Sequence, residues 1–114
     1  MVALQHSAWS SSARDGTLEI ALAGEIDHAN ADDLFARLRL ELEEVPAQVV
    51  VVNLSGVHFI DSSGLRLLLR SKTAAEGQGA AFLLRDLRPQ AQRLLAISGL
   101  TEHFAKGVGQ ADPG

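Results

Sequence analysis

The sequence has no cysteine and no tyrosine, and its aromatic residues are few: Trp9, Phe35, Phe59, Phe82 and Phe104. Without cysteine, a disulfide framework, a cysteine zinc site and a thiol nucleophile are all excluded. Basic residues are also scarce and unclustered, with 10 Lys and Arg against 14 Asp and Glu, a net charge of −4. A chain with so little basic and aromatic surface is not expected to bind nucleic acid.

Long hydrophobic runs and a signal-peptide pattern are missing too. No apolar run approaches the roughly 18 residues of a membrane span, and the first ten residues lack a basic region followed by an apolar stretch. We therefore expect a cytoplasmic protein without membrane association. The 114 residues, 46% of them hydrophobic, fit one domain, which we place at residues 1–104. Residues 105–114, rich in glycine and without periodicity, are predicted to form a flexible tail.

The first half of the chain predicts two strands and a helix. An edge strand over residues 4–9 is followed by a turn over residues 10–16, and apolar residues then alternate with polar or small ones until Gly24. Between Asn30, a residue type that caps helices, and Pro46, apolar residues spaced by three and four predict an amphipathic helix. These residues are Ala31, Leu34, Leu38, Leu42 and Val45. Asp32 and Asp33 fall in its first turn. The helix dipole stabilises acidic residues there, which explains this pair better than a catalytic role does.

The second half repeats a strand followed by a helix. Residues 47–54 are apolar and β-branched, as in a central strand covered on both faces, and a helix then follows Asp61 until Gly77 and Gly79. A strand over residues 80–84 precedes a third helix that starts at Pro89, and residues 100–104 fit a last short strand. Together these elements predict an α/β fold, with one partly parallel sheet and helices packed against it. Its core should include Val49, Val50, Val51, Val52, Leu65, Leu68, Leu69, Leu94 and Leu95.

The segment Asp61-Ser62-Ser63-Gly64-Leu65, between the central strand and the second helix, has the most informative side chains. Three interpretations of it are open. Asp61 or Ser62 caps the helix, or the free N–H groups receive an anion, or a hydroxyl here is phosphorylated.

Catalytic and metal sites fit the sequence less well. Ser62 or Ser63 with an Asp and one of His28, His58 or His103 can be written as a triad, but no nucleophile-elbow motif is present. A metal held by Asp27, His28 and Asp61 lacks any recognised ligand spacing, and the phosphate-loop motif does not occur. We therefore expect no enzyme activity, no metal and no cofactor.

The chain resembles a known family at three places along residues 18–104. The stretch Asn53-Leu54-x-x-Val57-x-Phe59-Ile60-Asp61-Ser62-Ser63-Gly64-Leu65 is similar to the signature of the STAS domain, as found in bacterial anti-sigma-factor antagonists. Leu22-Ala23-Gly24-Glu25-Ile26-Asp27 upstream and Arg88-Pro89-x-x-x-Arg93-Leu94-Leu95-x-x-Ser98-Gly99-Leu100 downstream resemble the other two landmarks of that family. Because all three occur in the right order, the set is more specific than the Asp-Ser-Ser-Gly motif alone.

The resemblance implies a mixed, partly parallel sheet of four to five strands with helices packed mainly on one side. It also implies a regulatory cycle without enzyme activity in this chain. In that cycle the unphosphorylated antagonist binds a serine-kinase anti-sigma factor and frees the sigma factor. Phosphorylation releases the partner, and the implied acceptor is Ser62 in preference to its neighbour Ser63. A serine phosphatase then returns the antagonist to its unphosphorylated form. The residues implied at the partner surface are Gly24, Glu25, Ile26, Asp27, His28, Asp61, Ser63, Gly64 and Leu65. Of these, Ile26 fits either the core or an exposed contact, and Leu65 fits the core better.

Two departures from the family pattern bear on assembly. Residues 105–114 are not expected to form the last helix of the family, so that apolar surface left bare would suit a homodimer or a larger complex, or would leave the domain only marginally stable. Arg88 stands where a serine often precedes the proline, which predicts a weaker helix start. The alternative function is a constitutive STAS scaffold, a subunit of a stress-signalling particle or a lipid-transport complex, and the genes beside this one would discriminate between the two.

Overall fold

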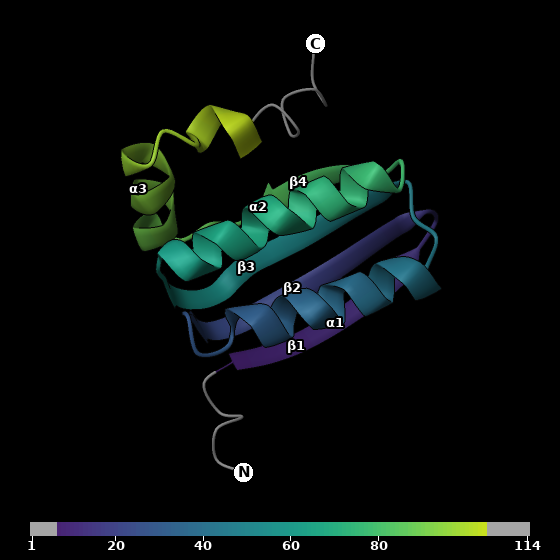
Figure 1. The fold of residues 1–114 in the computed structure, drawn as a ribbon, viewed down its shortest axis with the longest axis horizontal. Coiled ribbons are helices and arrows are strands. Elements are labelled where there is room, and N and C mark those ends of the chain that lie inside the picture. Colours follow the sequence, from purple (N-terminus) through teal and green to yellow (C-terminus); the bar gives the residue numbers. More distant parts are fainter. Residues whose placement is uncertain (1–6, 105–114) are drawn as a thin grey trace.

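The computed structural model describes residues 7–104 as a four-stranded sheet with helices (Figure 1). The strands lie in the sheet in chain order: β1 (Ser7–Arg14), β2 (Thr17–Ile26), β3 (Val49–Ile60) and β4 (Ala81–Arg85). β1 is antiparallel to β2, whereas β2 with β3 and β3 with β4 are parallel. The helices are α1 (Ala31–Glu44), α2 (Ser62–Gly77) and α3 (Pro89–Ile97). The predicted mixed, partly parallel sheet is confirmed, with four strands.

The first hairpin differs from its prediction. Residues 10–14 belong to β1, and only Asp15 and Gly16 form the turn, with positive φ angles of 53° and 81°. Two such residues between antiparallel strands are the signature of a type I′ turn, whose twist matches that of the strands. The serines suggested a loop, but pairing with the alternating residues of β2 draws them into the sheet.

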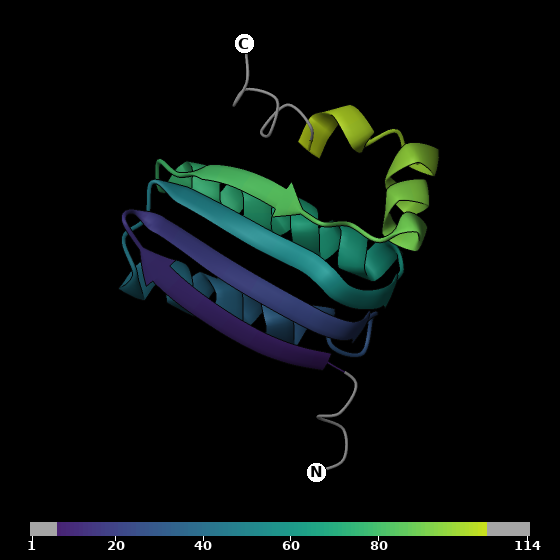
Figure 2. The ribbon, with the colours of Figure 1, turned by 180° about the vertical axis from the view of Figure 1, so that it is seen from behind.

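Helices α1 and α2 cover one face of the sheet, and the core lies beneath them (Figure 1). The other face has no helix over it, as the view from behind shows (Figure 2). The central strand is therefore not covered on both faces by helices. Val51, on the open face, is nevertheless buried, because it lies in register between Glu19 of β2 and Leu83 of β4.

The chain after β4 also departs from the sequence prediction. Residues 101–104 form a helical turn instead of a strand, which places Phe104 against Phe82 of β4 with their ring centroids 6.4 Å apart. Burial of this ring explains the choice, since a helical turn directs it back onto the sheet. The tail predicted over residues 105–114 lies outside the described residues. The same holds for the expectation that the last helix does not form there, on which the homodimer prediction depends. Within residues 7–104, no helix is long and apolar enough to cross a bilayer.

Candidate functional site

The candidate site forms where β2 and β3 end side by side. Ile26 and Ile60, the last residues of these strands, are in register, and the backbone N–H of Asp61 donates to the carbonyl oxygen of Ile26 at 3.2 Å. Carboxyl ends of neighbouring parallel strands lie at one edge of a sheet, where α/β folds carry their binding sites. The segment that begins at Asp61 and the upstream landmark that ends at Asp27 are thereby brought together.

Asp61 caps helix α2. Its carboxylate oxygen Oδ1 accepts hydrogen bonds from the backbone N–H groups of Ser63, at 2.8 Å, and Gly64, at 3.1 Å. These are two of the N–H groups that a helix start leaves without partners. The capping interpretation is therefore correct for Asp61, and it leaves the side chain of Ser62 outside the cap.

Gly64 allows α2 to start directly on the strand ends. A Cβ atom at this position would collide with Cγ1 of Ile60 and lie 2.9 Å from Cγ2 of Ile26. Any larger residue would push the start of the helix away from the sheet. The glycine of the motif thus determines how closely Ser62 and Ser63 sit to the turn that follows β2.

That turn, residues 27–30, is held by its own side chains. Oδ1 of Asp27 accepts from the N–H of Ala29, and Oδ1 of Asn30 accepts from the N–H of Asp27, both at 3.0 Å. The Asn30 side chain also donates to the carbonyl of Glu25 at 2.8 Å. Asn30 therefore occupies the N-cap position of α1 without capping it, because its amide is engaged by the preceding turn. This corrects its predicted role.

The predicted site residues divide by exposure. Glu25, His28 and Ser62 are exposed, and Gly24, Asp27, Asp61 and Ser63 are half-buried. Ile26, Gly64 and Leu65, by contrast, are buried in the core. Burial agrees with the core interpretation of Ile26 and Leu65, and none of the three is exposed for direct contact with a partner. The side chains of Ile26 and Leu65 support the surface from beneath, and Gly64 leaves room for Ile60 and Ile26.

Exposed Phe59, Gln90 of α3 and two arginines of α2 extend the site beyond the predicted residues. Phe59, on β3, is 43% exposed and pairs in register with Glu25. The side chain of Gln90, on α3, is hydrogen-bonded to the backbone of Ile60. Arg66 and Arg70 line a small pocket with His28 and Ser63. The spacing of three and seven residues from Ser63 along a helix was a signal for the arginines, whereas nothing local indicated Gln90.

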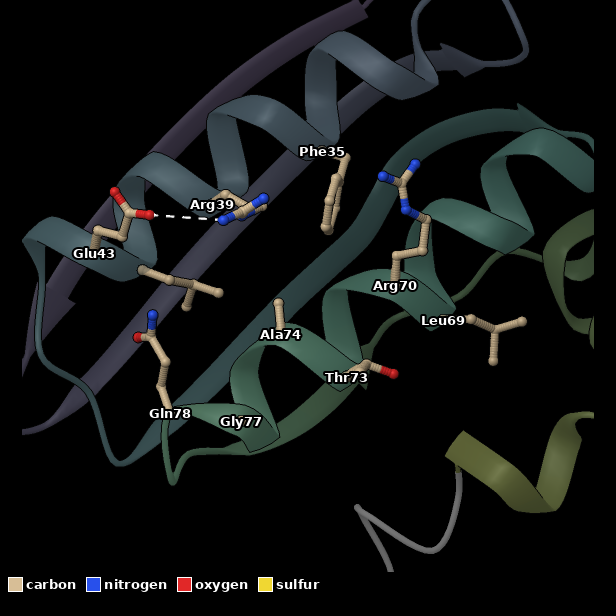
Figure 3. Close-up of a pocket in the computed structure, with 10 residues that line it drawn as sticks. Phe35, Arg39, Glu43, Leu69, Arg70, Thr73, Ala74, Gly77 and Gln78 are labelled. Carbon is tan, nitrogen blue, oxygen red and sulfur yellow. Dashed lines mark ion pairs between the residues drawn. The ribbon is translucent and has the colours of Figure 1, made fainter.

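A larger groove lies farther along the helices and does not contain the two serines. It has a volume of about 610 Å³ and runs between α1 and α2, with Arg70 at the end nearer the site (Figure 3). The guanidinium of Arg70 stacks over the ring of Phe35, with its carbon 4.0 Å from the ring centroid. This contact links the two helices and fixes Arg70 beside the start of α1.

A catalytic triad or a metal site at these residues would require specific contacts between their side chains. Within residues 7–104, neither Ser62 nor Ser63 donates a hydrogen bond to a histidine from its hydroxyl. In the same part of the chain, no three His, Asp or Glu side chains form a group that could hold a metal ion. What the site offers is an exposed serine at a helix start, with exposed Glu25, His28 and Phe59 on the strand ends and turn that precede the two helices.

Comparisons with known proteins agree with this architecture. The anti-sigma F factor antagonist of Paenibacillus polymyxa is 31% identical over 85 residues, which cover 75% of this chain and 73% of that protein. An anti-sigma factor antagonist from Mycobacterium paratuberculosis superposes with a TM-score of 0.71 and 25% identity, over 86% of this chain and 82% of that chain.

The fold is also that of the antagonist SpoIIAA, which has been solved unphosphorylated and phosphorylated. The unphosphorylated form has a TM-score of 0.71 and 23% identity, over 94% of this chain and 100% of that chain. The model of the STAS domain family matches residues 8–111. This match spans most of the sequence and includes both serines of the site. The chain therefore belongs to the STAS domain family.

Proposed function

We propose that this protein is an anti-sigma-factor antagonist controlled by phosphorylation. Its unphosphorylated form binds an anti-sigma factor that is also a serine kinase, and so frees a sigma factor. Phosphorylation of Ser62 dissociates the complex, and a serine phosphatase returns the antagonist to its unphosphorylated, binding form. The chain itself acts as a binding module without catalytic activity, in the cytoplasm where sigma factors work.

The observation that carries this proposal is the position of Ser62. It is the exposed member of the serine pair, at the first residue of α2, while the cap of that helix is made by Asp61. Its hydroxyl is therefore open to a kinase without unfolding of the helix. Exposed Glu25, His28 and Phe59 lie on the strand end and turn beside it, which supports one continuous surface for a partner.

The charge of a phosphate explains how binding would be switched. Phosphorylation adds about −1.5 to −2 charges at pH 7, next to the Asp61 carboxylate. Within the chain, the N-terminus of α2 offsets part of this charge. An acidic or apolar partner surface would offer no such compensation. Because each loss of about 1.4 kcal/mol lowers affinity tenfold, a single phosphate suffices to release a partner from a rigid domain.

The test uses the purified protein, ATP and the serine kinase of the histidine-kinase fold that is encoded nearest its gene. We expect phosphate on Ser62 by peptide mass spectrometry, with loss of the complex on gel filtration. Ser62→Asp should weaken the complex at least tenfold, whereas Ser98→Ala, a control at an exposed serine that ends α3, should bind as the wild type does. A complex that persists unchanged with Ser62→Asp would refute the switch. A stable complex with other subunits and no phosphate would favour the constitutive scaffold.

A further inference from the structure

Ser63 faces a different environment from Ser62. It lines a pocket of about 140 Å³ between the start of α2 and the start of α1. The residues around this pocket are His28, Ala31, Asp32, Ser63, Arg66, Leu67 and Arg70. Ser62 is exposed and does not line it. Of the two adjacent serines, Ser63 is therefore the one that lines this pocket.

The arginines of the pocket lie along the same side of α2 as Ser63. Arg66 is three residues after Ser63 and Arg70 seven residues after it, so that all three fall on one stripe of the helix. Side chains of helical residues lean toward the helix N-terminus. The long side chain of Arg66 thus covers the turn that contains Ser63.

The two guanidinium groups differ in how they are engaged. Arg70 contacts Asp32 at 3.5 Å and stacks over Phe35, which fixes its position. Arg66 forms neither an ion pair nor a cation–π contact with any of residues 7–104. Because Asp32 already pairs with Arg70, Arg66 is the guanidinium left over in the lining of this pocket.

We propose that this pocket holds a phosphoryl group carried by Ser63, with Arg66 as its main ligand and Arg70 as a second cation. Planar guanidinium groups recognise phosphate oxygens well, and Ser63 itself lines the pocket with both arginines. The inference rests on the proposed function in one respect, namely that a serine kinase acts on this surface.

The covalent step needs a nucleoside triphosphate bound by that kinase. Oγ of Ser63 forms a bond to the terminal phosphorus, the bond between the β- and γ-phosphates breaks, and the nucleoside diphosphate leaves. The hydroxyl proton passes to a base on the kinase. The product has a different effect from phosphorylation of Ser62, because its charge is neutralised by arginines of the same chain instead of facing a partner.

The experiment introduces phosphoserine during translation at position 63 or at position 62, so that no kinase and no partner are needed. The ³¹P resonance is followed from pH 4.5 to pH 8, across the second ionisation of the phosphate, whose ordinary pKa is about 6. Groups facing the phosphate are His28, Asp32, Asp61, Arg66 and Arg70. A His28→Gln background removes the imidazole from the lining of the pocket.

We expect the pKa of the phosphate on Ser63 to lie about half a unit below that on Ser62, since nearby cations favour the dianion. Arg66→Gln should raise it again, and Arg70→Gln should raise it less. Arg93→Gln, which removes an exposed arginine from α3, should leave it unchanged.

Equal pKa values at the two positions, or a value that does not respond to Arg66→Gln, would overturn the proposal. A phosphoserine-63 protein that fails to fold by circular dichroism, beside a folded phosphoserine-62 protein, would overturn it as well. Because no partner is present, these outcomes are independent of whether the antagonist cycle exists.

Discussion

The side-chain amide of Gln90 forms both backbone hydrogen bonds of Ile60: Nε2 donates to the carbonyl oxygen at 2.9 Å, and Oε1 accepts from the N–H at 3.0 Å. β4 ends at Arg85, and its last registered partner on β3 is Asn53. The end of β3 therefore has no strand on that side. Gln90 takes the place of one, and so joins α3 to the residue that precedes Asp61.

Gln90→Leu should lower the free energy of unfolding by about 1–3 kcal/mol, because the N–H and the carbonyl of Ile60 are left without their partners. Urea denaturation followed by circular dichroism measures this. Gln92→Leu is the matched control, since Gln92 donates only one exposed hydrogen bond, to Leu87. A loss of similar size in both variants would argue against a special role for Gln90.

Gly64→Ala should destabilise the protein by about 1–3 kcal/mol, because the added methyl group enters the space occupied by Ile60 and Ile26. Gly77→Ala, at the other end of the same helix, meets no atom within 4 Å and should be neutral or stabilise by up to about 1 kcal/mol. Thermal unfolding of the two variants tests the contrast. Equal melting temperatures would show that the start of α2 can shift without cost.

Asp61→Ala should cost about 0.5–2 kcal/mol, since the N–H groups of Ser63 and Gly64 lose their cap. Asp61→Asn keeps an acceptor oxygen at the same place and should cost less than half as much. Asp33→Asn, an exposed carboxylate in the first turn of α1, controls for the loss of charge near a helix start. If both substitutions of Asp61 were equally destabilising in urea, charge rather than capping would be the dominant effect.

Leu95→Ala should lower stability by about 2–5 kcal/mol, because this side chain is buried where α3 packs on the sheet. Ile97, two residues later on the same helix, is 82% exposed, and Ile97→Ala should change stability by no more than about 0.5 kcal/mol. Guanidinium denaturation of the pair is the measurement. A large loss with Ile97→Ala would mean that this side chain is covered in solution.

Local patterns were sufficient for most of the fold. The spacing of Leu34, Leu38 and Leu42 predicted α1, since periodicity directly reports which side faces the core. The glycines at 77 and 79 likewise predicted the end of α2. The serines of β1 wrongly indicated a turn, because pairing with β2 decides whether residues join this edge strand. The strand predicted over residues 100–104 was wrong for a related reason, since the contact of Phe104 with Phe82 favours a helical turn.

The helix cap at the candidate site could be predicted from the sequence, because Asp61 caps N–H groups only two and three residues away. The packing role of Gly64 could not, since one of its neighbours, Ile26, is distant in the chain. Ile26 could not be assigned to core or surface from the sequence, since its burial depends on α2 arriving above it. Gln90 is thirty residues from Ile60 along the chain, and such a contact leaves no periodic trace.

The hydrogen bond from Asp61 to Ile26, described above, has a kinetic consequence. It ties the start of α2 to the end of β2, so under the proposed function we expect a charge on Ser62 to act without rearrangement of the helix start. Under the proposed function, the delay between modification and sigma-factor recapture is then the lifetime of the complex alone. Such a switch responds as fast as its partner dissociates. Its rate then depends on the contacts between the two proteins rather than on a conformational barrier.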